Sequence, residues 1–313
     1  MWQATSHQVI HELRLVKNPR VQTEHNLRGA LREITDRVTH MTSCPPIALL
    51  FVLLCGCTHP VWAHGNLDEA IAATTAEIAK QPTNAELLTS RAWLLAQHQD
   101  WSASHADLDR AAVLAPGSNS VALLRGEIFA MAGDWIKARK ELEALVSREP
   151  QNSAAHGSLG RVLFSVGEFR ASAASFGRAA EYSAQPDVST FVNQSQAFES
   201  AHDPAGALKA LDNGIARLGK LVALVVPAVE LEVAAGRFDA ALARIDALLE
   251  ILPRKETWLV RRAELLEKAG RPDDARISWE KARKEFSALP PTRQSTPQMT
   301  TLGARIDAAL STR

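Results

Sequence analysis

The chain has 313 residues, with 35 lysines and arginines against 35 aspartates and glutamates, so its formal net charge is zero. This balance excludes the broad positive surface that attracts nucleic acid, and we expect no nucleic-acid partner. Alanine and leucine are abundant, tyrosine occurs once, and valine or isoleucine at strand spacing is scarce. The composition predicts an all-α protein.

Residues 1–40 are ordinary polar sequence that precedes the most apolar stretch of the chain. Signal peptides begin within a few residues of the translation start, so a signal peptide behind this segment conflicts with its position. A start at Met41, or a few codons earlier to include Arg37, removes the conflict. We interpret residues 1–40 as an N-terminal extension, explained by an incorrectly assigned start.

The apolar run from Ile47 to Cys57 is too short for the roughly 20 residues that span a bilayer, but it fits the core of a signal peptide. We therefore predict a signal peptide over residues 41–63. A helix of the folded core is the less favoured interpretation, because the repeats described below leave this run without a partner helix.

Two cleavage sites compete within this segment. The residues Leu54-Cys55-Gly56-Cys57 resemble a bacterial lipoprotein box, which implies cleavage before Cys57 and a lipid on that cysteine. The residues Val61-Trp62-Ala63 offer cleavage after Ala63 and release of a soluble protein. An uncleaved or cytosolic protein is the third alternative. We expect an exported protein, either periplasmic or anchored to the envelope as a lipoprotein.

A lone helix is predicted over residues 64–84. Asn66 is a candidate N-cap, and Glu69 follows three residues later as in a capping box. We expect the folded body to begin near His64 and this helix to end at about Lys80.

A period of 34 residues runs through the rest of the chain. The stretches AGDWIKA (132–138), VGEFRAS (166–172) and AGRFDAA (235–241) are one motif written three times. Small residues recur with the same phase at Ala70, Ser104, Ala138, Ser172, Ala207, Ala241 and Ala275. Prolines at Pro82, Pro116 and Pro150 close successive units, because proline cannot continue a helix.

This pattern resembles the tetratricopeptide repeat (TPR) family. The resemblance implies an α-solenoid, a right-handed superhelix of antiparallel helix pairs with a glycine-containing turn inside each pair. Six repeats over residues 85–290 are expected to begin near Ala85, Asn119, Ser153, Val188, Val222 and Glu256. One extra residue separates the third repeat from the fourth, and we expect the superhelix to change pitch or flex there.

Residues 291–313 are predicted to form a linker and a capping helix. The stretch PPTRQSTPQ (290–298) is polar and broken by proline, whereas Leu302, Ile306 and Leu310 lie four apart on one helical face. Repeat arrays need such a helix to cover the open surface of the last repeat.

Catalytic, cofactor and metal sites are not indicated by the sequence. His7 and His11 have the spacing of two metal ligands on one helix face, but no third ligand is near them. The recurring Trp101, Trp135 and Phe169, with Phe238, occupy one repeat position, and we expect them to be core between helices rather than a stacking platform. We predict that the protein is not an enzyme.

A groove lined by the first helices is the surface that the resemblance implies. By resemblance, the ninth residue of each repeat faces it: Trp93, Glu127, Arg161, Gln196, Glu230 and Glu264. With more glutamates nearby, this face is expected to be acidic and to bind an extended, net-basic or polar peptide, with Trp93 as an apolar anchor. The alternative is that these residues are only solvated helix surfaces.

The function implied by these features is that of a scaffold or adaptor at the bacterial envelope that binds a protein or peptide partner. The alternative is a dedicated accessory subunit of one envelope enzyme or of one secretion or assembly machine. Membrane association is expected only through a lipid on Cys57.

Overall fold

A computed structural model describes residues 65–311, and every regular element in that range is a helix. The prediction of an all-α solenoid with a C-terminal capping helix is confirmed. The chain divides into two units, Met1–Ala63 and His64–Arg313. The predicted extension, the signal peptide, Cys57 and the two N-terminal histidines all lie in the first unit, outside the described residues.

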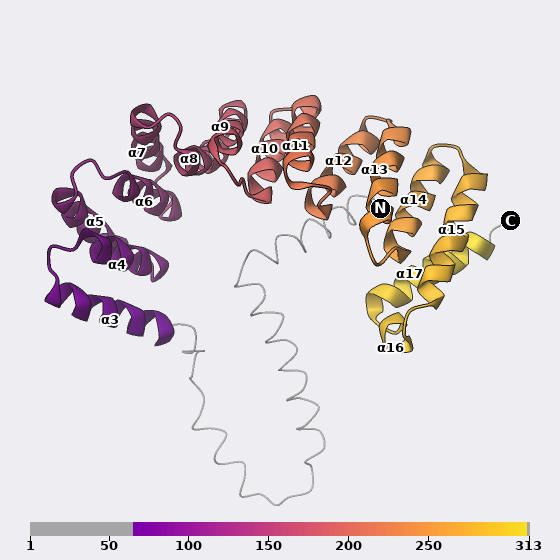
Figure 1. Ribbon diagram of the computed structural model, residues 1–313, viewed down its shortest axis with the longest axis horizontal. Coiled ribbons are helices and arrows are strands. Elements are labelled where there is room, and N and C mark those ends of the chain that lie inside the picture. The colour runs from indigo at the N-terminus through magenta and orange to yellow at the C-terminus, as the bar shows by residue number, and fades with distance from the viewer. Residues whose placement is uncertain (1–64, 312–313) are drawn as a thin grey trace, which may run out of the picture. The chain divides into compact units, whose positions relative to one another are not determined.

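The helices of the second unit follow one another in pairs after a single first helix, α3 (Figure 1). Their bounds are α3 Gly65–Lys80, α4 Ala85–Gln97, α5 Trp101–Leu114, α6 Asn119–Met131, α7 Trp135–Arg148, α8 Ser153–Ser165, α9 Phe169–Tyr182, α10 Val188–Ser200, α11 Pro204–Leu218, α12 Val222–Ala234, α13 Phe238–Ile251, α14 Glu256–Lys268, α15 Pro272–Ser287, α16 Pro291–Gln294 and α17 Pro297–Ser311. No helix in this part of the chain is both long and apolar enough to cross a membrane.

The first helix of each pair begins at the residue from which the 34-residue period counts. Local capping explains several of these starts: the side chain of Asn84 accepts hydrogen bonds from the N–H groups of Glu86 (3.0 Å) and Leu87 (3.3 Å). At the N-terminal end, α3 begins at Gly65, so Asn66 lies inside the first turn and not at the N-cap that we predicted. At the other end, α16 occupies part of the segment predicted as a linker.

The turn inside each pair requires one residue in the left-handed region of φ. Glycine supplies it in four repeats, for example Gly133 with φ of +80°. In the first and fourth repeats Gln99 (φ +66°) and His202 (φ +57°) occupy the same place. The turn geometry is thus retained without glycine, at the cost of crowding around the β-carbon.

Close helix crossing within a repeat explains the glycine, alanine or serine at the eighth position of every repeat except the fifth, which has Val229. A β-carbon on Gly126 would lie 2.7 Å from Cγ of Leu142, which is fully buried. The eighth residue is buried in all six repeats: Ala92, Gly126, Gly160, Ser195, Val229 and Ala263. The core therefore runs along the array as a series of clusters between neighbouring helices.

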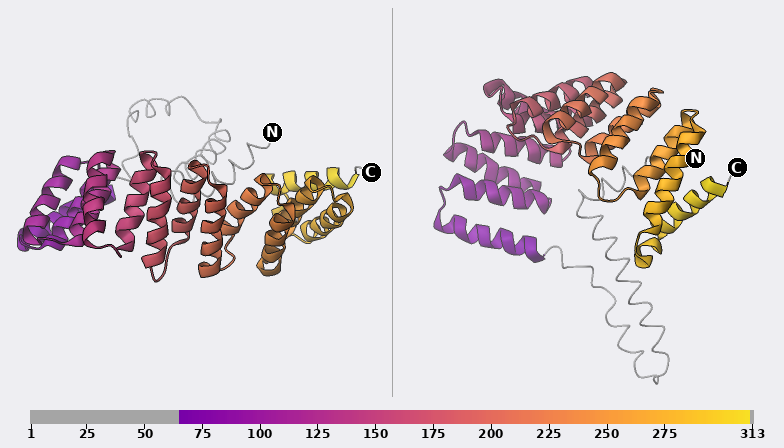
Figure 2. Two further views of the ribbon diagram at one scale, coloured as in Figure 1. Left: turned by 90° about the horizontal axis from the view of Figure 1, so that it is seen from above. Right: turned by 45° about the vertical axis from the view of Figure 1, so that its right-hand side comes forward.

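The first helices of neighbouring repeats also touch one another, α4 with α6, α6 with α8, and α10 with α12. Figure 1 shows α4 and α6 on the same side of α5 and α7, and Figure 2 shows the stack from two further sides. We call the exposed side of α4, α6, α8, α10, α12 and α14 that carries their ninth residues the inner face.

Ion pairs join most neighbouring repeats. They include Arg125–Asp109 (2.6 Å), Arg139–Glu168 (2.6 Å), Arg244–Asp212 (2.7 Å), Arg262–Asp246 (2.6 Å) and Arg271–Asp239 (3.2 Å). Within residues 65–311 no ion pair joins the third repeat to the fourth. At that junction α9 packs extensively against α10, and Arg217 donates hydrogen bonds to the carbonyls of Ala180 and Ser183 (2.9 Å for Ser183).

Candidate functional site

The inner face carries the six residues that the repeat register predicts to meet a partner. Each ninth residue follows the buried eighth residue by one position, so the packing of the eighth residue fixes the direction in which the ninth points. Trp93 is 40% exposed, whereas tryptophan is on average highly buried in folded proteins. Arg161 and Gln196 are exposed, and the three glutamates are partly buried.

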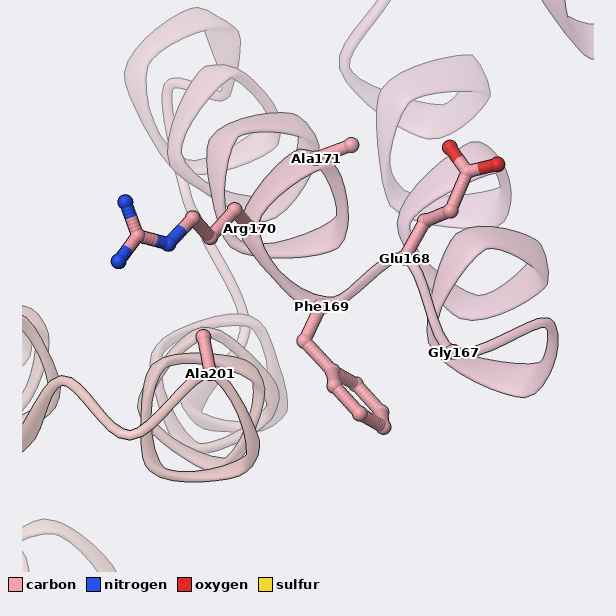
Figure 3. A pocket seen from close by; sticks show the side chains of 6 residues that line it. All are labelled: Gly167, Glu168, Phe169, Arg170, Ala171 and Ala201. Atoms are coloured by element: carbon pink, nitrogen blue, oxygen red, sulfur yellow. The ribbon is translucent and has the colours of Figure 1, made fainter.

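Two cavities of the described residues lie away from the ninth residues, at the edge formed by the turns within the repeats. One of about 400 Å³ lies between the α8–α9 turn and the end of α10, and Phe169 and Arg170 line it together with Ala201 (Figure 3). A second, of about 360 Å³, lies between α11 and the α12–α13 turn and is lined by Leu208, Asp212 and others. Both are open, so neither encloses a small molecule in the way that a cofactor site does.

The aromatic residues at the start of the second helices border this edge. Trp135 is 37% exposed, and Trp101, Phe169 and Phe238 are half-buried. These four residues are thus core only in part: Trp101 packs against the buried cluster of the first repeat, and all four keep part of the ring accessible. Phe169 meets the ring of Phe164 edge-on, with 5.3 Å between centroids.

Each of the three ninth-position glutamates has an arginine partner. Glu127 pairs with Arg161 of the next repeat at 3.2 Å and also accepts a hydrogen bond from the Ser158 hydroxyl at 2.6 Å. Glu230 pairs with Arg261 of α14, and Glu264 pairs with Arg305 of α17. The acidic character that we expected for this face is consequently neutralised within the protein at three positions.

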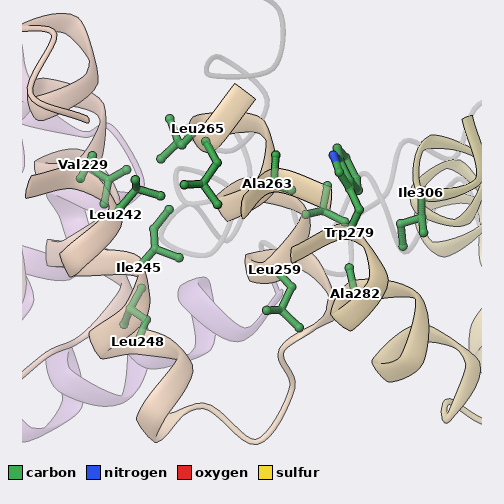
Figure 4. Close-up of a cluster of buried hydrophobic side chains, with 14 of the residues drawn as sticks. Val229, Leu242, Ile245, Leu248, Leu259, Ala263, Leu265, Trp279, Ala282 and Ile306 are labelled. Atoms are coloured by element: carbon green, nitrogen blue, oxygen red, sulfur yellow. The ribbon is translucent and has the colours of Figure 1, made fainter. Parts of the chain in front are cut away.

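Arg305 reaches Glu264 because α17 is fixed against the last repeat. Leu302 and Ile306, two of the three residues predicted to form its apolar face, are buried. They join the cluster that contains Trp279 of α15 (Figure 4). The capping helix thus closes the core and also contributes a charge to the inner face.

The arginines at this end of the inner face repel one another. Burial lowers the pKa of Arg261, and the positive charge of Arg305 lowers it further. The Nε atom of Arg261 is buried and has no hydrogen-bond partner. Burial and the charge of Arg261 likewise lower the pKa of Lys268. Arg261 nevertheless pairs with Glu230, and Arg305 pairs with Glu264, so each arginine at this end is balanced by a carboxylate.

Glu199 differs from the other glutamates of the inner face. It lies three residues after Gln196 on α10, and its carboxylate accepts only a long hydrogen bond of 3.4 Å from the Ser195 hydroxyl. Desolvation raises the pKa of Glu199, and the Ser195 bond offsets this only in part. By contrast, Glu267 on α14 accepts a 2.7 Å hydrogen bond from the indole N–H of Trp279.

Within the described residues, no group of three or more histidines, cysteines and carboxylates is placed to hold a metal ion.

Sequence reasoning missed Arg261 and Arg305 as members of the inner face. The sixth repeat position of Arg261 was a usable signal, because it lies three residues before Glu264 on the same helix. Arg305 had no such signal.

Comparisons with known proteins agree with this architecture. The family model of the tetratricopeptide repeat matches residues 61–119, 89–154, 123–187 and 227–289. The C-terminal part of a TPR repeat-containing protein from Cytophaga hutchinsonii is similar in structure, with a TM-score of 0.56 at 14% identity over 77% of this chain and 96% of that chain. A tetratricopeptide repeat protein from Parabacteroides merdae gives 0.45 at 14% identity over 79% and 94%.

No curated protein matches the chain. Repeats of this type are generally non-catalytic modules for binding proteins or peptides. The family model covers more than half of the chain, and its matches fall on the helix pairs of all repeats except the fourth. The chain therefore belongs to the tetratricopeptide repeat family.

Proposed function

We propose that the protein is a non-catalytic scaffold or adaptor that binds an extended segment of a partner protein along its inner face. The observation that carries this proposal is the exposure of Trp93 at the ninth position of the first repeat. Tryptophan is the residue type most enriched at the energetic centres of protein interfaces, because it buries a large apolar area with few rotatable bonds.

Apolar and polar regions follow one another along the inner face. Met131, at the end of α6 in the second repeat, is 42% exposed, and with Trp93 it makes the N-terminal repeats the apolar part of this face. The central repeats expose Arg161 and Gln196, whereas the last repeats carry the glutamates paired with Arg261 and Arg305. An extended segment with an apolar side chain near one end suits this order.

We further propose that this scaffold acts outside the cytoplasm, in the periplasm or at the envelope. The apolar run between residues 47 and 57 supports export, and Cys57 is the candidate for a lipid anchor. Mass spectrometry of the mature N-terminus tests this part. A first residue at Cys57 that carries lipid supports the lipoprotein, an N-terminus at His64 supports soluble release, and an intact N-terminus contradicts export.

The scaffold itself is tested by capture of partners from native membranes. We expect Trp93→Ala to lower the affinity for the captured partner by at least about 2 kcal/mol, or roughly 30-fold. Ile136→Ala is the matched control, because Ile136 is 83% exposed on α7, a second helix that lies off the inner face. It should leave capture unchanged.

A second variant, Gln196→Lys, introduces bulk and charge at the middle of the inner face without breaking an ion pair. Capture that is unaffected by both Trp93→Ala and Gln196→Lys would exclude the inner face as the binding surface. A partner that co-purifies at a fixed ratio would identify the protein as a dedicated accessory subunit.

A further inference from the structure

Negative charge along the inner face is compensated unevenly by neighbouring arginines. Glu127, Glu230 and Glu264 are each bound by an arginine of a neighbouring helix. A positively charged ligand group would have to displace that arginine before it could bind any of these carboxylates. These three positions are therefore poor sites for a cation from outside.

Glu199 has no such partner. Within the part of the chain that the structure describes, no lysine, arginine or histidine pairs with its carboxylate, and the Ser195 hydroxyl at 3.4 Å is its one side-chain hydrogen bond. Its neighbour one helical turn earlier is the exposed, uncharged Gln196. The middle of the inner face thus contains an uncompensated negative charge.

The position of Glu199 within its helix raises the free energy of its negative charge. α10 ends at Ser200, so Glu199 lies in the last turn, where the free carbonyl groups give the helix a partial negative charge. That turn contains no basic residue. Glu86, another glutamate of the first helices, lies in the first turn of α4, where the helix dipole stabilises a carboxylate. Local structure therefore disfavours the charge of Glu199 and favours that of Glu86.

Glu199 is solvent-exposed, so a ligand can reach its carboxylate, while the atoms around it still desolvate it in part and raise its pKa. Three features therefore disfavour the charged form of this one residue on the proposed binding surface: it has no cationic partner, it lies at a helix C-terminus and it is partly desolvated. Positions at which a residue conflicts with its local structure are frequently functional sites, and a cation from a ligand would supply the partner that the fold does not give Glu199.

We infer that Glu199 forms a subsite for one lysine or arginine side chain of the bound segment, beside Gln196, whose amide can hydrogen-bond to the segment's main chain. This inference rests on the proposed function and specifies the chemistry of its partner. A side-chain cation suits the site better than a metal ion, because a single carboxylate with one amide lacks the ligand number that a metal requires. The partner segment then combines an apolar side chain for Trp93 with a basic one for Glu199.

The test uses synthetic peptides of about 12 residues, built from alanine and serine with one leucine and one variable residue at several spacings. The variable residue is lysine, arginine, norleucine or glutamate, and Kd is measured by fluorescence anisotropy with the full chain. We expect the wild-type protein to bind the best lysine or arginine peptide about tenfold more tightly than its norleucine counterpart.

Two substitutions and one control make this preference specific. Glu199→Gln should reduce it to less than about twofold while leaving the Kd of the norleucine peptide unchanged, and Glu199→Lys should transfer the preference to the glutamate peptide. Glu264→Gln removes a carboxylate that is already paired with Arg305, so it should retain the basic preference. Thermal melts of each variant show whether the fold is intact.

The outcomes separate the two proposals. Suppose that Trp93→Ala abolishes binding, while the Glu199→Gln variant remains as selective for basic peptides as the wild type. This result would overturn the Glu199 subsite and leave the scaffold proposal standing. Wild-type binding with no basic preference would do the same. Binding that neither Trp93→Ala nor Glu199→Gln changes, or no binding of any peptide, would contradict both.

Discussion

The ion pair between Arg91 and Asp107 permits a quantitative prediction about the N-terminal end of the array. Nε and Nη2 of Arg91 on α4 donate to the two carboxylate oxygens of Asp107 on α5, each at 2.7 Å. A third guanidinium nitrogen, Nη1, donates to the hydroxyl of Thr75 on α3 at 3.1 Å. One side chain therefore connects the lone first helix with both helices of the first repeat.

The expected cost of breaking this pair follows from its burial. The Asp107 side chain is only 4% exposed and that of Arg91 18%, so Arg91→Met leaves a buried carboxylate without its bidentate partner. Removing one member of a buried pair costs about 3–5 kcal/mol. We expect the lower end, about 3 kcal/mol, because Arg110 lies 3.9 Å from Asp107 and offsets part of the loss.

The double variant Arg91→Met/Asp107→Leu should behave differently. It replaces both charges with apolar groups of similar size, which is close to neutral in other buried pairs, so we expect a loss within about 1 kcal/mol. The double variant should therefore be about 2 kcal/mol more stable than Arg91→Met alone.

Amide hydrogen exchange is the appropriate assay, because repeat arrays open locally and need not unfold in one step. In Arg91→Met, protection of the slowest amides of α4 and α5 should fall about 100-fold, while that of α14 and α15 serves as an internal control and stays constant. A loss under 1 kcal/mol in the single variant, or an equal loss in the single and double variants, would refute this account of the buried pair.

Three further predictions concern single positions. Gln99→Gly should raise the stability of the first repeat by about 0.5–1 kcal/mol in the same exchange assay, because glycine adopts φ of +66° without crowding; a loss would show that the Gln99 side chain has a packing role. Gly126→Ala should lower the free energy of unfolding by about 1–2 kcal/mol, since the new β-carbon would meet buried Leu142. Gly157→Ala should raise it by up to about 1 kcal/mol, because the nearest atom lies 3.9 Å from the new β-carbon and alanine favours the helix. Equal effects of the two variants in urea titrations would contradict this difference. The pKa of Glu199 is raised in the native state, so the native state binds the proton of this carboxyl group more tightly than the unfolded state does. The protonated carboxyl group therefore contributes stability below the unfolded pKa, and this contribution is lost as pH rises through the native pKa. Glu199→Gln should therefore raise Tm at pH 7 but not at pH 4, and a lower Tm at pH 7 would contradict the unpaired state of this carboxylate.

The repeat architecture was predictable because its signals are local and recur. A residue with positive φ recurs in the turn of all six repeats, and a small eighth residue and a closing proline each recur in five of them, because each is required by one turn or one helix crossing. The starts of α4 and α14 follow from counting alone. Repetition thus converts weak single-residue signals into a register for the whole array.

The charge state of the inner face was not predictable in the same way. Pairing of Glu264 with Arg305 depends on how α17 docks, and that helix stands outside the repeat. Pairing of Glu127 with Arg161 depends on the rotation between two successive repeats, which the spacing does not specify. The partial exposure of Trp135 likewise reflects how neighbouring turns meet. Composition and register identify which residues reach the inner face, but not which of them compensate one another.

The junction between the third and fourth repeats has a consequence for how the array responds to salt. Ion pairs between partly exposed side chains weaken as added salt screens them, whereas the packing of α9 on α10 and the bonds from Arg217 to backbone carbonyls are much less sensitive. High ionic strength should therefore loosen the junctions on either side before this one. The two middle repeats would then persist as a single cooperative block, and the loss of order would advance toward it from both ends of the chain.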